Sequence, residues 1–174
     1  MIDLPGHPVF HHFRGYRGPL PQGVQCGWLG DMYRAEWLGV PSTPLMEQYE
    51  ATAPLPNHEE YFEWIGLLDA VATARRRFVM MEFGAGFGRW GVRGALAARQ
   101  VGLAPSEIAV TFVEAEPDHV QWLRDTIAMN RGLDGVKTNL VDAAVTGADG
   151  EVLFATGHSK EWYGQEITLS LIHI

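Results

Sequence analysis

Phe78-Val79-Met80-Met81-Glu82-Phe83-Gly84-Ala85-Gly86-Phe87-Gly88 is the stretch that decides the fold. The apolar run 78–81 has the length of a strand that is buried on both faces. Glycine permits positive φ and lets a ligand approach the main chain closely, and three glycines follow this run. A helix is predicted next, over about 89–100. The order predicts a ligand-binding turn between strand and helix; a plain turn is the alternative, but it needs fewer glycines.

Helices and strands alternate outward from this stretch. A helix with Asn57 as its N-cap and Glu60 in a capping box is expected to end near Arg76. Further elements are predicted as a strand over 108–113, a helix from Pro117, a strand over 136–141, a turn at Asp149-Gly150 and a short hairpin strand over 151–155. Such alternation predicts a three-layer α/β fold of Rossmann-like type, with a parallel sheet, helices on both faces and a ligand beyond the carboxyl ends of the strands.

Residues 1–56 differ from the rest of the chain in being rich in glycine, proline and aromatic residues, with weak periodicity. Short helical pieces are predicted over 31–38 and 44–52. We interpret 1–56 as an irregular or helical cap over the main domain, and 57–174 as the Rossmann-like domain.

The spacing of the glycines and the acid before them separate two ligand classes. The dinucleotide fingerprint G-x-G-x-x-G would place its last glycine where Arg89 stands, whereas the third glycine here is Gly88. A carboxylate at Glu82 would repel a pyrophosphate. S-adenosylmethionine has no phosphate and carries a sulfonium and an ammonium, which favour nearby negative charge. The loop therefore favours S-adenosylmethionine over a nicotinamide or flavin dinucleotide.

Further carboxylates follow the next two predicted strands. Glu114 ends the second strand, where an acid can accept hydrogen bonds from ribose hydroxyls. Glu116 competes for this role, but it directly precedes Pro117 and suits a helix N-cap, so Glu114 is favoured. Asp142 follows the third strand and is expected either to border the adenine or to be a solvated turn residue. Glu82 and Glu114 are expected to face a shared cleft.

These stretches resemble the FkbM-type S-adenosylmethionine-dependent methyltransferases. The similarity covers roughly 57–167, and the sequences that carry it are Glu82–Gly88, Phe112–Pro117, Val141–Val145, Asp149-Gly150 and Trp162-Tyr163-Gly164-Gln165. The resemblance implies O-methylation of a hydroxyl on a sugar or a small secondary metabolite. It implies that the glycines lie along the methionine portion of the cofactor and that the acids lie at its amino-acid end, ribose and adenine. Taken together, the residues and the resemblance predict that the cofactor is bound by Glu82, Phe83, Gly84, Ala85, Gly86, Phe87, Gly88, Glu114, Ala115, Asp142 and Ala143.

The chain departs from this family after Gly164, because it has no counterpart of the next strand with its Asp-x-Glu-Gly kind of motif. We therefore expect a chain truncated at its C-terminus, with strands of the sheet missing. A non-catalytic cofactor-binding fragment is the alternative to a methyltransferase, and an oxidoreductase is the less favoured one. No catalytic residue can be assigned.

Composition and charge restrict the partners. A formal net charge of −8 disfavours broad nucleic-acid binding. Cys26 is the only cysteine, which excludes an internal disulfide and fits a cytoplasmic location. No apolar run approaches the ~20 residues of a membrane span. The histidines at 7, 11 and 12 lack supporting carboxylates, so no metal is expected. His119, just after a predicted helix start, is expected to be solvated.

Overall fold

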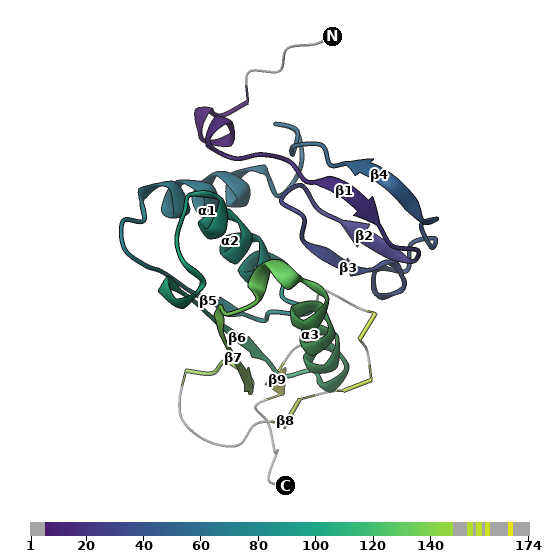
Figure 1. Ribbon diagram of the computed structural model, residues 1–174. Coiled ribbons are helices and arrows are strands. Elements are labelled where there is room, and N and C mark those ends of the chain that lie inside the picture. Colours follow the sequence, from purple (N-terminus) through teal and green to yellow (C-terminus); the bar gives the residue numbers. More distant parts are fainter. Residues whose placement is uncertain (1–5, 148–152, 155, 158, 161–166, 169–174) are drawn as a thin grey trace, which may run out of the picture.

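The structure is a computed structural model of the chain (Figure 1), and it describes residues 6–147, 153–154, 156–157, 159–160 and 167–168. Its centre is a parallel three-stranded sheet in the order β5-β6-β7. The strands are β5 Phe78–Phe83, β6 Ile108–Glu114 and β7 Lys137–Asp142. All three were predicted from the sequence to within two residues at either end. The sheet and the helices that connect its strands are consistent with a Rossmann-like fold.

Among the described residues, three α-helices accompany this sheet: α1 Tyr61–Thr73, α2 Arg89–Gln100 and α3 Pro117–Met129. The predictions for α2 and for the start of α3 are confirmed. The predicted start of α1 is wrong, because the chain turns at His58 and Glu60 occupies the N-cap position. The Glu60 carboxylate pairs with Arg89 and Arg93 instead of completing a capping box with Asn57.

The predicted end of α1 near Arg76 is also wrong, because the helix stops at Thr73. The hydroxyl of Thr73 donates to the carbonyls of Asp69 and Ala70 at 2.8 and 3.1 Å, which satisfies acceptors in the last turn. The three arginines at 75–77 follow the helix and are exposed.

The described helices lie on one face of the sheet, not on both as predicted (Figure 1). Gly91 of α2 packs against Val110 and Phe112 of β6, and Leu123 of α3 reaches the same side. The reason is topological. Right-handed crossovers that move in one direction, from β5 to β6 to β7, place both connecting helices on the same face.

The other face of the sheet is exposed in the part of the chain that the structure describes. Side chains of Val79, Met81 and Phe83 alternate with buried or partly buried ones along β5 and are 58%, 54% and 61% exposed. The prediction of a strand buried on both faces is therefore wrong for β5. Its run of apolar residues could not show that only one face is covered.

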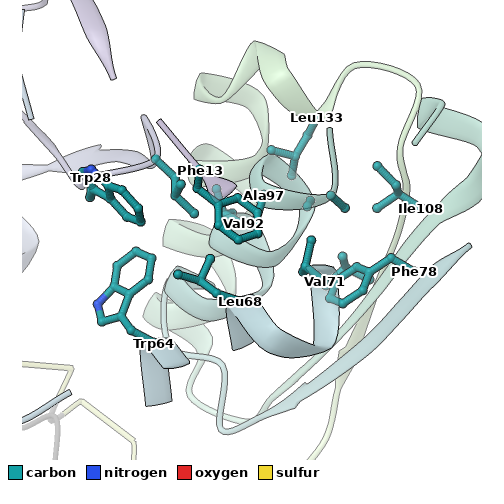
Figure 2. Close-up of a cluster of buried hydrophobic side chains, with 14 of the residues drawn as sticks. Phe13, Trp28, Trp64, Leu68, Val71, Phe78, Val92, Ala97, Ile108 and Leu133 are labelled. Carbon is teal, nitrogen blue, oxygen red and sulfur yellow. The ribbon is translucent and has the colours of Figure 1, made fainter. Parts of the chain in front are cut away.

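The main hydrophobic core lies between the sheet, α1 and α2, and it continues into the N-terminal region (Figure 2). Figure 2 shows Leu68 and Val92 between the sheet residues Phe78 and Ile108 and the rings of Trp28 and Trp64. Trp28 and Trp64 meet edge to face, with ring centroids 6.0 Å apart. Residues 6–56 thus share a core with α1 and α2, and α2 directly follows the glycine loop.

The N-terminal region is more regular than the irregular or helical cap that we predicted. It forms two small antiparallel sheets and two 3₁₀ helices. The elements are η1 Pro8–His12, β1 Arg17–Leu20, β2 Val24–Cys26, β3 Met32–Arg34, η2 Ala35–Leu38 and β4 Met46–Glu50. The helical piece predicted over 31–38 is confirmed only for η2, and the one over 44–52 is wrong. Strands of three to five residues are too short to show a clear period.

Two further 3₁₀ turns, η3 Pro105–Glu107 and η4 Arg131–Leu133, precede β6 and β7. Near the C-terminus, β8 Leu153–Phe154 pairs antiparallel with β9 Ile167–Thr168. β8 lies within the strand predicted over 151–155. The predicted Asp149-Gly150 turn and the stretch 162–165 lie outside the described residues. Within the described ranges, every helix is too short or too polar to span a bilayer.

Candidate functional site

The glycine loop after β5 has a backbone that only glycine adopts readily. Gly84, Gly86 and Gly88 have φ values of +61°, +55° and +81°. A Cβ at Gly84 would meet no protein atom within 4 Å, whereas one at Gly88 would collide with Leu123 and Phe112. Gly88 is therefore needed for packing between helix and sheet, while Gly84 leaves open space beside the main chain.

Glu82 lies just before this loop, and its side chain caps the N-terminus of α2. Its carboxylate accepts hydrogen bonds from the main-chain nitrogens of Trp90 at 3.2 Å and Gly91 at 2.7 Å. Burial raises the pKa of Glu82 to about 7, although these N–H groups and the nearby arginines Arg89 and Arg93 act to lower it. The side chain is only 9% exposed.

Glu114, at the end of β6, is bound to the loop. One of its carboxylate oxygens accepts from the nitrogen of Gly86 at 2.6 Å, and the other accepts from Ala115 and Glu116, both at 2.9 Å. Burial acts to raise the pKa of Glu114. The neighbouring His119 and these main-chain donors outweigh burial and hold the pKa below its usual value.

His119 is buried beside Glu114, so the expectation of a solvated ring is wrong. Its Nδ1 lies 3.8 Å from Glu114 Oε1, close enough to form an ion pair when the ring is protonated. Burial alone would lower the pKa of His119, but the carboxylates of Glu114 and Glu116 and the carbonyl of Ser159 raise it. Glu116 itself caps α3 by accepting from the nitrogen of His119 at 3.0 Å, as predicted for an N-cap.

Asp142 and Ala143 stand at the end of β7. Asp142 pairs in register with Glu114, and the nitrogen of Ala143 donates to the carbonyl of Glu114 at 3.0 Å. Both residues are exposed. The three strands therefore bring their carboxyl ends, and the predicted residues on them, to one edge of the sheet.

A cavity of about 260 Å³ opens at this edge. Five of the predicted residues line it: Glu82, Gly84, Ala85, Gly86 and Phe87. Its described lining does not include Phe83, Gly88, Glu114, Ala115, Asp142 or Ala143. Glu114 reaches the cavity wall only through its bond to Gly86, so the structure does not place the two carboxylates on one shared cavity surface.

The remaining lining residues, Leu38, Glu60, Arg89 and Trp90, were not predicted as site residues. Arg89 forms two hydrogen bonds with Glu60, Nη1 to Oε1 at 3.0 Å and Nη2 to Oε2 at 3.2 Å. The spacing of Arg89 and Arg93 could have indicated that both arginines lie on one face of α2, because residues four apart share one face of a helix. Their acidic partners, Glu60 and Asp31, come from distant parts of the chain, which no sequence pattern reveals.

The N-terminal region packs directly on the loop. The rings of Tyr33 and Trp37 lie 5.1 and 5.9 Å from that of Phe87, centroid to centroid. Leu38 lines the cavity from the same segment. Residues 33–38 thus contact the glycine loop through Phe87 and form part of the cavity wall.

Comparison with known proteins gives two similarities. No family model matches the chain. A curated protein of Jannaschia sp. (strain CCS1), named "Putative methyltransferase", is 26% identical over 118 residues, which cover 66% of this chain and 41% of that protein. The crystal structure of a SAM-dependent methyltransferase from Agrobacterium tumefaciens aligns with a TM-score of 0.38 at 20% identity, over 75% of this chain and 33% of that one. The chain spans less than half the length of both.

Proposed function

We propose that this chain binds S-adenosylmethionine and provides the cofactor-binding part of a methyltransferase. The observation that carries the proposal is the position of Glu82. Its carboxylate accepts from the nitrogens of Trp90 and Gly91, which are among the free donors at the N-terminus of α2.

Those same donors are the groups that a pyrophosphate would need. A dinucleotide places its phosphates on the N-terminus of the helix that follows the glycine loop. Here the side chain of Glu82 already takes these donors, and in its ionised form it would also repel a phosphate. A sulfonium or ammonium would instead be attracted to it, which favours a nucleoside that carries positive charge and no phosphate.

The open space beside Gly84 supports the same ligand. A cavity of about 260 Å³ is below the ~300–1,000 Å³ usual for a drug-sized ligand, so it would hold only part of the cofactor. We place the methionine end there, along Glu82, Phe83, Gly84, Ala85, Gly86, Phe87 and Gly88. The nucleoside would extend along the strand ends, past Glu114 and Ala115 to Asp142 and Ala143.

Glu114 retains the capacity for the ribose in this arrangement. A carboxylate has about four acceptor sites, and the nitrogens of Gly86, Ala115 and Glu116 take three of them. The fourth would accept a ribose hydroxyl. The exposed Asp142 would accept from the adenine amine.

The reaction proposed is O-methylation of a hydroxyl on a sugar or small metabolite, as in the FkbM-type enzymes that the sequence resembles. When bound, the cofactor supplies a methyl group on a sulfonium, and the protein must align an acceptor oxygen with it. Leu38 and Trp90, which line the cavity, would offer apolar surface to the acceptor. A non-catalytic cofactor-binding unit is the second candidate, because Val79, Met81 and Phe83 form an exposed apolar face in the described part of the chain, which is the kind of surface that binds another protein.

Calorimetric titration with S-adenosylmethionine, S-adenosylhomocysteine and NADH tests the proposal, with Gly84→Asn as the variant. Asparagine tolerates a left-handed backbone better than most residues, and its Cβ would meet no protein atom at position 84. We expect the variant to fold and to lose binding of the first two ligands.

Gly102→Asn is the matched control, because Gly102 also has positive φ, +91°, and open space around its Cβ, but lies beyond the opposite end of α2. It should bind as the wild type does. Binding of NADH alone, or equal binding by the wild type and Gly84→Asn, would overturn the proposal. Methyl transfer to a hydroxyl acceptor by the S-adenosylmethionine-bound protein would separate the enzyme from the non-catalytic unit.

A further inference from the structure

The lining of the cavity beside the glycine loop includes a charged pair. Arg89 and Glu60 both line the cavity, and their side chains are 30% and 19% exposed. Arg89 is the only cationic residue in the described lining, which also holds the two acids Glu60 and Glu82. A cation and two anions thus border one small space at the end of the glycine loop.

The orientation of Arg89 is fixed from several sides. Glu60 holds both terminal nitrogens, and the guanidinium carbon lies 5.8 Å from the ring centroid of Tyr33 and 5.9 Å from that of Phe87. A guanidinium so restrained loses little further freedom when it binds a second partner.

Arg89 also keeps donors that this pairing does not use. A guanidinium has five N–H bonds, and Glu60 takes two. Nε has no hydrogen-bond partner among the described residues, but it is buried, so the donors left for a ligand belong to the terminal nitrogens. Each terminal nitrogen carries a second N–H, so the arginine can bind another carboxylate without releasing Glu60.

Glu60 does not depend on Arg89 alone. Its Oε2 also accepts from Nη1 of Arg93 at 3.2 Å, and Arg93 is anchored by Asp31 at 3.0 Å and lies over the rings of Trp64 and Trp90. Glu60 is therefore a positioning residue, and Arg93 as well as Arg89 balances its negative charge. Glu60 thus stays paired with Arg93 when Arg89 binds a second partner.

We propose that Arg89 binds the α-carboxylate of the cofactor, while Glu60 and Glu82 face its α-ammonium. This inference rests on the proposed function and adds a specificity to it. A site that holds one cation and two acidic groups matches the zwitterion of an amino acid. The cavity would then select nucleosides that carry an amino acid over nucleosides that lack one.

The test compares two ligands on the whole chain by calorimetry. S-adenosylhomocysteine carries the amino acid, and 5′-methylthioadenosine is the corresponding thioether nucleoside without it. We expect the wild type to prefer the first. Arg89→Met should weaken binding of the first by about tenfold to hundredfold and leave binding of the second unchanged. Arg89→Lys, which keeps the charge but not the planar fork, should recover part of the loss.

Arg76→Met is the matched control, because it removes the same charge from an exposed position after α1. It should bind both ligands as the wild type does. A variant Arg89→Met that folds and weakens both ligands equally, or neither, would overturn the role of Arg89 while the proposed function stands. Failure of the wild type to bind either ligand would overturn both.

Discussion

The main-chain nitrogen of Gly86 donates a hydrogen bond to Oε2 of Glu114 over 2.6 Å. This bond joins the middle of the glycine loop to the last residue of β6. The other oxygen of the carboxylate accepts from Ala115 and Glu116. One buried side chain thus fixes the loop after β5 and the turn after β6 relative to each other.

We expect Glu114→Gln to lower the free energy of unfolding by about 1–3 kcal/mol. Glutamine has one carbonyl oxygen for three donors, and its amide nitrogen would face main-chain N–H groups. Urea unfolding at neutral pH measures the difference. Asp142→Asn is the control, because Asp142 is exposed at the paired position of the next strand, and it should change stability by no more than about 0.5 kcal/mol. Equal losses in the two variants would contradict this role of Glu114.

The raised pKa of Glu82 predicts a pH dependence of stability. In the folded chain this pKa is about 7, against an ordinary value of 4.5. Between these values the folded state holds a proton that the unfolded state has released. The contribution of Glu82 is therefore fully present below about pH 4.5 and is lost as the pH rises through 7, by up to about 1.4 kcal/mol per pH unit.

Glu82→Gln should remove this share of the decline, because glutamine does not titrate. Urea unfolding of both proteins between about pH 5 and pH 8 gives the two slopes. His119 also has a raised pKa and acts in the same direction, so a shallower decline remains in the variant. Identical slopes would show that Glu82 does not titrate in this range.

Arg93 and Asp31 form a buried ion pair, with side chains 4% and 2% exposed and Nε to Oδ2 at 3.0 Å. We expect Arg93→Met to cost about 3–5 kcal/mol, because it leaves the carboxylate of Asp31 buried without a partner. Burial already raises the pKa of Asp31, and Arg93 offsets part of that effect. Thermal and urea unfolding measure the loss.

The double variant Arg93→Met, Asp31→Asn should recover much of this stability, since it buries no unpaired charge. A loss in the double variant equal to the sum of the two single losses would mean that the two residues act independently. That result would contradict an ion pair that links the N-terminal region to α2.

Local pattern determined the order of elements around the glycine loop. The apolar run at 78–81, the glycines and Pro117 fixed β5, the turn, α2 and the start of α3, because these signals act within a few residues. The same signals identified Glu82, which the structure places on the cavity with four other predicted residues. The cofactor-binding roles of all eleven predicted residues stay predictions; Phe83, Gly88, Glu114, Ala115, Asp142 and Ala143 are the six that do not line the cavity.

Long-range contacts decided the rest. Only the tertiary structure brings Glu60 to Arg89 and Asp31 to Arg93, and only the direction of the strand order shows that the helices share one face of the sheet. The physical reason is that hydrogen bonding along a helix or strand is a property of neighbouring residues. An ion pair between residues 31 and 93 depends instead on how whole elements pack, which no local pattern records.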